Sequence, residues 1–413
     1  MPKHTLISRR FRGYYLLIAV LLLSQNNYSQ DSIAPSYSFK WDNGFKLKSS
    51  DNNFSLDFGG RIFVDHARFF PNSNLERNYG EMNHNSRTDV TSARLFFSGE
   101  IYQNVEFKFQ VDFSGEKVAF KDVYIGITNI PAIGNLRVGQ LHEPFRFSSL
   151  TSGKYTTFME RGPNTSFSYE RNVGAVIFND FLDDRLSAQL GAFQNPNNST
   201  LEALDHDGYA VTGRITGLPI RNIEKRRLLH VGVGYSFRNP ESNEYEVAIS
   251  PGSKLADKLL DTYVIQNVND LGLLNFEAVY IHGPFSLQAE YLNASIDIEN
   301  GSHNFSSFNG ELSYFLTGES KIYGSSYGGF GRVKPRKNFG GKDKGFGAWE
   351  VAAKFSHTDL NDGIVMGGQQ SLFAIGLNWY LNPVTQFMFN YSHASIENQG
   401  NIDIIQARLQ VDF

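Results

Sequence analysis

The chain has 413 residues, enough for several ordinary domains or for one large barrel. Aromatic residues make up 14% of it, and this surplus of Phe and Tyr favours β structure. A formal net charge of −4 gives no electrostatic reason to expect a nucleic-acid partner, and the absence of cysteine excludes disulfides, thiolate metal sites and a Cys nucleophile.

The N-terminal region has the pattern of a secretory signal peptide. Basic residues between positions 3 and 12 precede the apolar run 14–23, and a polar stretch follows. Ten apolar residues are too few to span a membrane as a stable helix. We therefore expect a signal peptide over residues 1–29, cleaved between positions 24 and 31, and an exported protein. After residue 23 the sequence predicts no transmembrane helix.

Apolar and polar residues alternate with a period of two along most of the remaining chain. In residues 105–114 the apolar positions carry Val and Phe, and the polar positions carry Glu, Lys, Gln and Asp. The same rhythm recurs at 285–293, 349–358 and 387–394, and it indicates strands with one apolar and one polar face. Two architectures fit such strands: a soluble, secreted β-sandwich that binds a ligand, and a transmembrane barrel.

The chemistry of the two faces favours the barrel. Large aromatic residues occupy the apolar face and charges lie in the middle of the polar face, as expected for strands between lipid and a wet lumen. We expect an all-β protein, a transmembrane antiparallel β-barrel over residues 54–413 after an N-terminal lead-in at 30–53. Its turns would be short at the periplasmic end and its loops long at the extracellular end. Within one loop, residues 253–263 could form a short helix.

The last nine residues, 405–413, alternate strictly and end on Phe413. A barrel has to pair its last strand with its first, because lipid cannot satisfy a free sheet edge. The ending resembles the sorting signal read by the bacterial outer-membrane assembly machinery. We therefore expect that partner, a location in the outer membrane, and lipid and lipopolysaccharide around the barrel.

Eight segments, in order from about residue 54 to the end, resemble the phosphate-selective porin O and P family. They are "LDFGGRIFVDHARF" (56–69), "SARLFFSGEIY" (92–102), "VGQLHEPFRFSSLTSGKYTTFMERG" (138–162), "LLHVGVGYSFR" (228–238), "GPFSLQAEYL" (283–292), "SYFLTGESKIY" (313–323), "GAWEVAAKFSHTDLND" (347–362) and "GLNWYLNP" (376–383). The resemblance implies a 16-stranded porin that forms a homotrimer and takes up anions, including phosphate, by passive diffusion.

Strand parity places two balanced sets of charges in the lumen. The cations are Arg61, Arg94, Lys108, Arg137, Lys354 and Arg408, and the acids are Asp65, Glu106, Asp112, Glu290, Glu350 and Asp412. For each cation, the alternative to anion binding is a solvated residue paired with a neighbouring acid. Ion selectivity follows the charge at the constriction, so a balanced wall predicts a weakly selective pore.

The family resemblance adds further candidates and also departures. It places a pore-narrowing loop at 141–155, with Arg146 and Lys154 as its cations. It implies a ladder of pore arginines that Arg61 matches, but Thr91-Ser92 stands at a tandem-arginine position, and Ser149 and Glu106 stand at two lysine positions. The basic stretch 331–345, with Lys334, is either an anion-attracting loop at the mouth or a solvated extracellular loop. A phosphate-preferring pore and an unspecific porin both remain open.

Catalytic patterns are weak. "GSSYG" (324–328) fits G-x-S-x-G, but a glycine-rich loop follows where a helix is required. His142-Glu143 is half of a zinc-protease motif and lacks the second histidine. We expect no enzyme, no metal site and no cofactor. An outer-membrane barrel enzyme is the alternative from another class, and it would need a convergent catalytic set near one rim.

Overall fold

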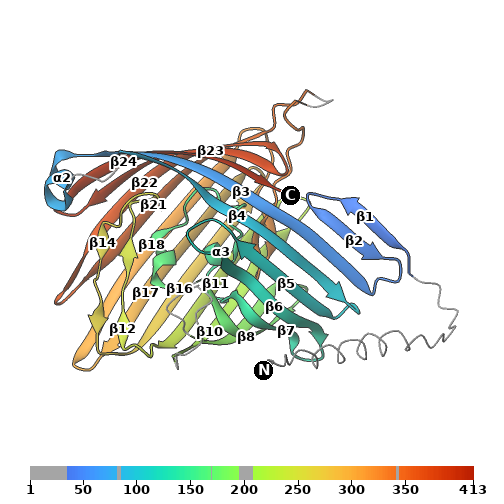
Figure 1. The fold of residues 1–413 in the computed structure, drawn as a ribbon, viewed down its shortest axis with the longest axis horizontal. Coiled ribbons are helices and arrows are strands. Elements are labelled where there is room, and N and C mark those ends of the chain that lie inside the picture. Colours follow the sequence, from blue (N-terminus) through green and yellow to red (C-terminus); the bar gives the residue numbers. More distant parts are fainter. Residues whose placement is uncertain (1–34, 81–84, 169, 195–207, 341–343) are drawn as a thin grey trace, which may run out of the picture. The chain divides into compact units, whose positions relative to one another are not determined.

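The computed structural model describes residues 35–80, 85–168, 170–194, 208–340 and 344–413. The expected signal peptide lies outside the described residues. Sixteen antiparallel strands form a closed barrel, because β24 pairs with β3 as well as with β23 (Figure 1). In chain order they are β3 (Phe54–Pro71), β4 (Ser86–Ile101), β5 (Val105–Asp112), β6 (Ala119–Ile130), β7 (Gly134–His142), β8 (Arg171–Phe181), β9 (Leu186–Gln194), β10 (Tyr209–Asn222), β11 (Arg227–Asn239), β16 (Val268–His282), β17 (Phe285–Ile298), β18 (Gly301–Phe315), β21 (Ala348–Asp362), β22 (Val365–Asn382), β23 (Thr385–Ile396) and β24 (Gly400–Asp412).

The period of two in the sequence becomes the two faces of this wall. On β24, Ile405 and Leu409 are exposed on the outer face, while Arg408 and Gln410 are buried on the lumen face. Exposed aromatic side chains such as Phe389 continue the outer face on the neighbouring strands. An apolar outer band and a polar lumen face are what a membrane-spanning barrel requires. No helix among the described residues is long and apolar enough to cross a membrane.

A hairpin precedes the barrel. Its strands β1 (Tyr37–Trp41) and β2 (Phe45–Ser49) pair with each other, and β2 pairs with β3 from Phe45↔Phe58 to Lys48↔Ser55. On this edge of β3, residues 61–71 pair with β24 and residues 55–58 pair with β2. There the backbones of Phe413 and Gly60 exchange two hydrogen bonds of 2.7 and 3.0 Å, which close the barrel.

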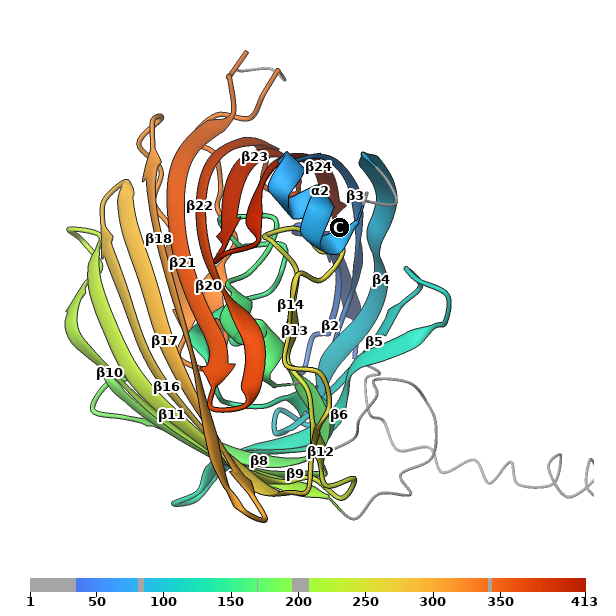
Figure 2. The ribbon, with the colours of Figure 1, turned by 90° about the vertical axis from the view of Figure 1, so that its left-hand side faces the viewer.

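Long connections gather at one end of the barrel, which is by this criterion the extracellular end. They include 72–85 with α2 (Ser73–Tyr79), 143–170 with α3 (Phe147–Leu150) and the 3-10 helix η1 (Pro163–Phe167), and 240–267. The last holds β12 (Glu244–Tyr245), β13 (Ala248–Ile249), β14 (Leu260–Asp261) and β15 (Ile265–Gln266). The helix expected at 253–263 was wrong, because these residues form turns and β14. Figure 2 looks into this end, with α3 inside the ring and β13 and β14 across the opening.

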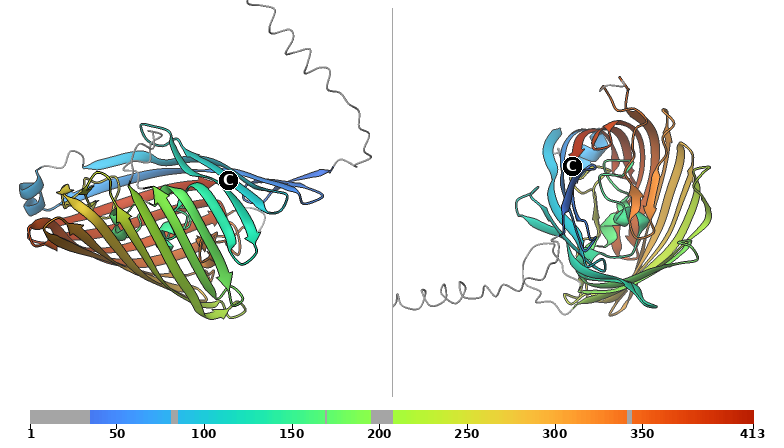
Figure 3. Two further views of the ribbon diagram at one scale, coloured as in Figure 1. Left: turned by 90° about the horizontal axis from the view of Figure 1, so that it is seen from below. Right: turned by 90° about the vertical axis from the view of Figure 1, so that its right-hand side faces the viewer.

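The other end carries short turns and the C-terminus, with one exception (Figure 3). The connection between β18 and β21, residues 316–347, contains β19 (Ile322–Ser325) and β20 (Gly329–Gly331). It starts and ends at the periplasmic rim, where Phe315 pairs with Glu350. Of the two alternatives for 331–345, the solvated extracellular loop was therefore wrong, and an anion-attracting loop at a mouth of the pore stays a prediction.

Candidate functional site: the lumen pathway

Three connections fold into the lumen and leave a pathway along one part of the wall. Loops 143–170 and 240–267 enter from the extracellular end, and segment 316–347 enters from the periplasmic end. Loop 143–170 and segment 316–347 meet inside the barrel, where the Phe330 N–H donates to Thr151 Oγ1 at 3.1 Å. Phe147 packs edge-on against the same Phe330 ring, with a centroid distance of 5.0 Å. These contacts make loop 143–170 and segment 316–347 one packed unit.

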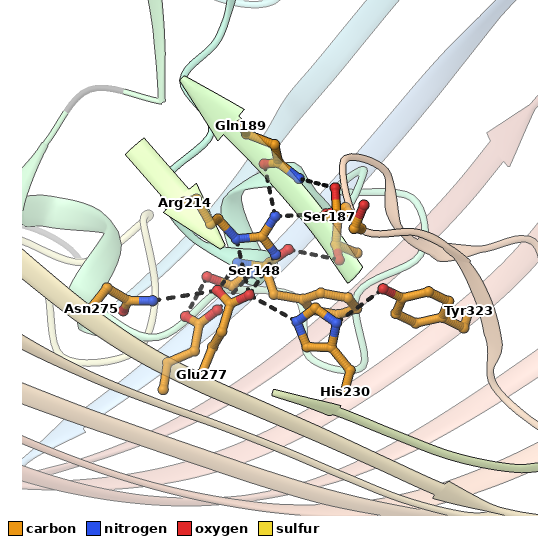
Figure 4. Close-up of polar contacts among 12 residues, drawn as sticks. Ser148, Ser187, Gln189, Arg214, His230, Asn275, Glu277 and Tyr323 are labelled. Atoms are coloured by element: carbon orange, nitrogen blue, oxygen red, sulfur yellow. Dashed lines mark hydrogen bonds and ion pairs between the residues drawn. The ribbon is translucent and has the colours of Figure 1, made fainter. Parts of the chain in front are cut away.

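A buried polar network fixes this unit to the wall formed by β10, β11 and β16 (Figure 4). Arg214 donates from Nε to Glu277 Oε1 at 3.0 Å, and His230 Nε2 lies 2.8 Å from the same oxygen. The second carboxylate oxygen of Glu277 accepts from the Phe147 N–H at 2.8 Å, and His230 Nδ1 lies 3.0 Å from the Tyr323 hydroxyl. One carboxylate on β16 thus connects the wall to the loop, and His230 connects the wall to the periplasmic segment.

A second carboxylate anchors the start of the same loop. Glu290 accepts from the N–H and the hydroxyl of Ser148, at 2.7 and 2.6 Å. Arg146, a candidate pore cation, is fully buried within the loop, where it donates to Ser149 Oγ at 3.0 Å and to the Asn164 carbonyl. Its guanidinium therefore holds two parts of the loop together. It does not border the three lumen cavities that form the pathway.

Three neighbouring cavities lie between these segments and the wall among the described residues. The periplasmic cavity, about 510 Å³, lies between β3–β7 and loop 143–170. The outer cavity, about 260 Å³, lies between loops 143–170 and 240–267 and the wall of β21–β24. The middle cavity, about 230 Å³, shares Arg61, Arg94 and Gly153 with the first and Glu160 and Lys254 with the second. Arg161 borders all three, so the cavities are neighbours along the lumen.

Most wall cations that strand parity assigned to the lumen are paired with acids. The pairs are Arg94–Asp112 at 2.6 Å, Lys108–Asp122 at 2.6 Å, Arg137–Glu106 at 2.6 Å, Arg408–Asp65 at 2.7 Å and Lys354–Glu311 at 3.4 Å. Lys154, from the loop, pairs with Asp412 at 3.0 Å. Each of these pairs adds little net charge to the pathway.

Arg61 is different. Its Nε donates to Ser92 Oγ at 2.9 Å, and its guanidinium lies over the Phe63 ring, 4.8 Å from the centroid. Within the described part of the chain it forms no ion pair with a carboxylate, although it is only 9% exposed. Ser92 therefore supports Arg61 with a hydrogen bond and adds no second positive charge.

Two further cations of the middle cavity come from loops, and the sequence reasoning missed both. Lys254 donates to the Thr91 carbonyl at 3.2 Å, and burial lowers the pKa of its amine. Arg161 donates from Nε to the Ser148 carbonyl at 2.8 Å and pairs with Glu170 at 3.1 Å. Burial alone would raise the pKa of Glu170, but the charges of Arg161, His142 and Arg171 outweigh it and lower that pKa to about 2. Glu170 is therefore ionised at neutral pH.

Lys334 lies at the periplasmic end with segment 316–347 and is exposed. Arg332, two positions earlier, forms an ion pair with Asp412, which also binds Lys154 from loop 143–170. The described residues contain no group of three or more His, Asp or Glu side chains arranged to hold a metal ion.

Comparison with known proteins agrees with this geometry. The family described as phosphate-selective porin O and P matches residues 67–413. The chain belongs to this family. Porin O of Pseudomonas aeruginosa is 23% identical over 401 residues, which cover 88% of each chain. An uncharacterised protein of Caulobacter vibrioides is also 23% identical, over 90% of this chain and 76% of its own.

Solved porin structures share the fold of this family member. The anion-selective porin from Comamonas acidovorans superposes with a TM-score of 0.56, at 12% identity over 87% of this chain and all of that one. OmpF of Salmonella typhi, in complex with daunomycin, gives 0.55 at 12% identity, over 91% and 100%. The trimer form of OmpT of Vibrio cholerae gives 0.53 at 10% identity, over 86% and 99%. The protein is an outer-membrane porin, and its family and fold indicate a channel rather than an enzyme.

Proposed function

We propose that this porin conducts anions in preference to cations and that phosphate is among its solutes. The observation that carries the proposal is the buried guanidinium of Arg61, which faces the middle cavity without a carboxylate partner among the described residues. Selectivity in a wet pore is set where low-dielectric walls focus the field of fixed charges. The smallest of the three cavities is such a place.

The charges around the middle cavity support this sign. Its border includes the cations Arg61, Arg94, Arg161, Lys254 and Arg408 and a single acid, Glu160. Arg94, Arg161 and Arg408 are each neutralised by a carboxylate. Arg61 and Lys254 then outnumber Glu160, and the balance at this level is positive. Guanidinium and ammonium groups are also the ordinary protein donors for phosphate oxygens.

A weakly selective general porin is the second candidate, and the ion pairs along the periplasmic cavity favour it. Lys108, Arg137 and Lys154 each meet an acid there, so that stretch of the wall is close to neutral. The two functions differ in a planar bilayer. In a KCl gradient, the reversal potential of an anion-preferring pore lies closer to the equilibrium potential of chloride than to that of potassium, and phosphate reduces its chloride current. A reversal potential closer to the equilibrium potential of potassium, together with no effect of phosphate on the current, would contradict anion preference and favour the general porin.

We further propose that the protein assembles as a homotrimer and that its C-terminal strand is read by the outer-membrane assembly machinery. The trimer form of the structural neighbour OmpT supports the first part. The strict alternation of apolar and polar residues over 405–413, most of which lie in β24, supports the second. Native gel migration and crosslinking of the detergent-extracted protein would test the trimer. Removal of Phe413 should reduce the amount of heat-modifiable barrel in the outer membrane if the second proposal is correct.

A further inference from the structure

The outer cavity has a wall chemistry that differs from that of the cation-rich middle cavity. Ser356 on β21, Gln370 on β22 and Ser392 on β23 border it, and each is at most 3% exposed. The Oε1 atom of Gln370 is buried and has no hydrogen-bond partner among the described residues. Unsatisfied buried amide groups are costly, so a rotation of this side chain that brings its amide to a hydrogen-bond partner in the adjoining cavity would be favourable.

Apolar side chains lie between these polar groups. Leu372 and Ala374 follow Gln370 on the lumen face of β22, and Phe158 borders the cavity from loop 143–170. Inorganic phosphate has no carbon skeleton and gains nothing from such neighbours. A hydroxylated carbon skeleton presents both kinds of surface: hydroxyl groups for amide and hydroxyl partners, and C–H groups for aliphatic and aromatic ones.

Four cations border the outer cavity. Lys354 on β21 is paired with Glu311 at 3.4 Å, and Lys258 comes from loop 240–267. Lys254 and Arg161 belong both to this cavity and to the middle cavity, where Arg61 also lies. A ligand that spans the two would therefore place its anionic group at the shared border and its neutral part against β21–β23. Among common hydrophilic solutes, phosphate monoesters of sugars and polyols have this division into an anionic group and a hydroxylated body.

We infer that the outer cavity binds the hydroxylated body of a sugar phosphate or polyol phosphate while the phosphate group lies at the middle cavity. The inference rests on the proposed anion preference and adds a substrate class to it. It assigns Gln370 and Ser392 to the recognition of hydroxyl groups, and Arg61 and Lys254 to the recognition of the phosphate group. The pore then discriminates between phosphate esters by their neutral part.

The test compares how solutes block chloride current through the full-length protein in planar bilayers. The probes are glucose 6-phosphate, methyl phosphate, inorganic phosphate and glucose. Glucose 6-phosphate should block at a concentration at least about fivefold below that of methyl phosphate, which is the factor expected from one additional neutral hydrogen bond. In Gln370→Leu and Ser392→Ala, the half-blocking concentration of glucose 6-phosphate should rise by about fivefold each, with that of methyl phosphate unchanged.

Gln386→Leu is the matched control. Gln386 is also a buried lumen glutamine with an unpartnered amide atom, but it does not border the outer cavity. It should leave the block by both esters unchanged, and heat-modifiable gel migration should show that all three variants fold. Equal block by the two esters, or an equal shift of both in the Gln370 and Ser392 variants, would overturn the inference while leaving anion preference intact. Absence of block by every phosphate compound, together with cation preference, would overturn both proposals.

Discussion

Replacing Arg61 by Gln removes the one wall arginine of the pathway whose charge meets no acid in the described structure. An anion about 4 Å from a guanidinium gains ~1 kcal/mol in bulk water and ~4 kcal/mol at the effective dielectric of a protein surface. The middle cavity is water-accessible, so the lower figure is the appropriate minimum. A change of ~1 kcal/mol corresponds to about a fivefold change in partitioning. We therefore expect Arg61→Gln to lower the chloride-over-potassium permeability ratio by at least about fivefold.

The assay is the reversal potential in a KCl gradient at no more than 0.1 M salt, where the screening length is still about 10 Å. The control is the double variant Arg94→Gln/Asp112→Asn, which deletes a paired cation and its acid, 2.6 Å apart in the same part of the wall. It changes the shape of the cavity border but not its net charge, so its permeability ratio should stay close to that of the parent. An unchanged ratio in Arg61→Gln, or an equal fall in the paired control, would refute the assignment of selectivity to Arg61.

Three further outcomes are expected. Glu277→Leu leaves Arg214 buried without its carboxylate, which should destabilise the protein by about 3–5 kcal/mol. We expect more open-channel noise and a lower temperature of heat modification. The second change Arg214→Met should largely restore the low noise and the higher temperature, because it removes the unpaired charge. Gly59→Ala places a Cβ 2.2 Å from the carbonyl oxygen of Phe413, so it should weaken barrel closure by about 1–3 kcal/mol and lower the temperature of heat modification. Gly217→Ala is the control, because the atom nearest to its Cβ lies 3.8 Å away, and it should leave that temperature unchanged. The pKa of Glu170 is lowered from 4.5 to about 2, so the stability that its ion pair adds to the loop should be fully present from pH 7 down to 4.5. It should then decline between pH 4.5 and 2 and be lost at about 2; single-channel noise that rises fully by pH 4.5 would contradict this.

The wall was predictable from the sequence because strand alternation is a local signal. The side chain of every second residue points to the same face, so Arg61, Asp65 and Arg408 could be assigned to the lumen without knowledge of the barrel. Their pairing could not, because Arg408 and Asp65 are 343 positions apart in the chain and meet only when the barrel closes. Strand parity is enough to predict which residues line the lumen. Which of their charges form ion pairs depends on contacts that exist only in the closed barrel.

The loops were not predictable in the same way. Arg161 and Lys254 lie in segments without periodicity, and their places depend on contacts with strands far away in the sequence. The extracellular placement of 331–345, which lies in segment 316–347, was a different kind of error, because the number of strands after this segment indicates its end of the barrel. Counting hairpins back from the C-terminal strand puts the connection before β21 at the same end as the C-terminus. The high positive charge of 331–345 suggested an extracellular loop as one alternative, whereas the strand count places these residues at the periplasmic end.

The arrangement of the three inserted segments explains how a barrel with a balanced wall can acquire a preferred sign. Glu277 holds loop 143–170 against the wall, and its partners His230 and Arg214 hold segment 316–347 there through Tyr323 and Ser326, so that part of the lumen is filled. The open route is thereby confined to the part of the wall that carries Arg61, and Lys254 is brought to it from loop 240–267. Selectivity then depends on the few charges beside the route rather than on the sum over the wall. If this is correct, loosening the Glu277 anchor should reduce the permeability ratio without any change in the charges that border the middle cavity.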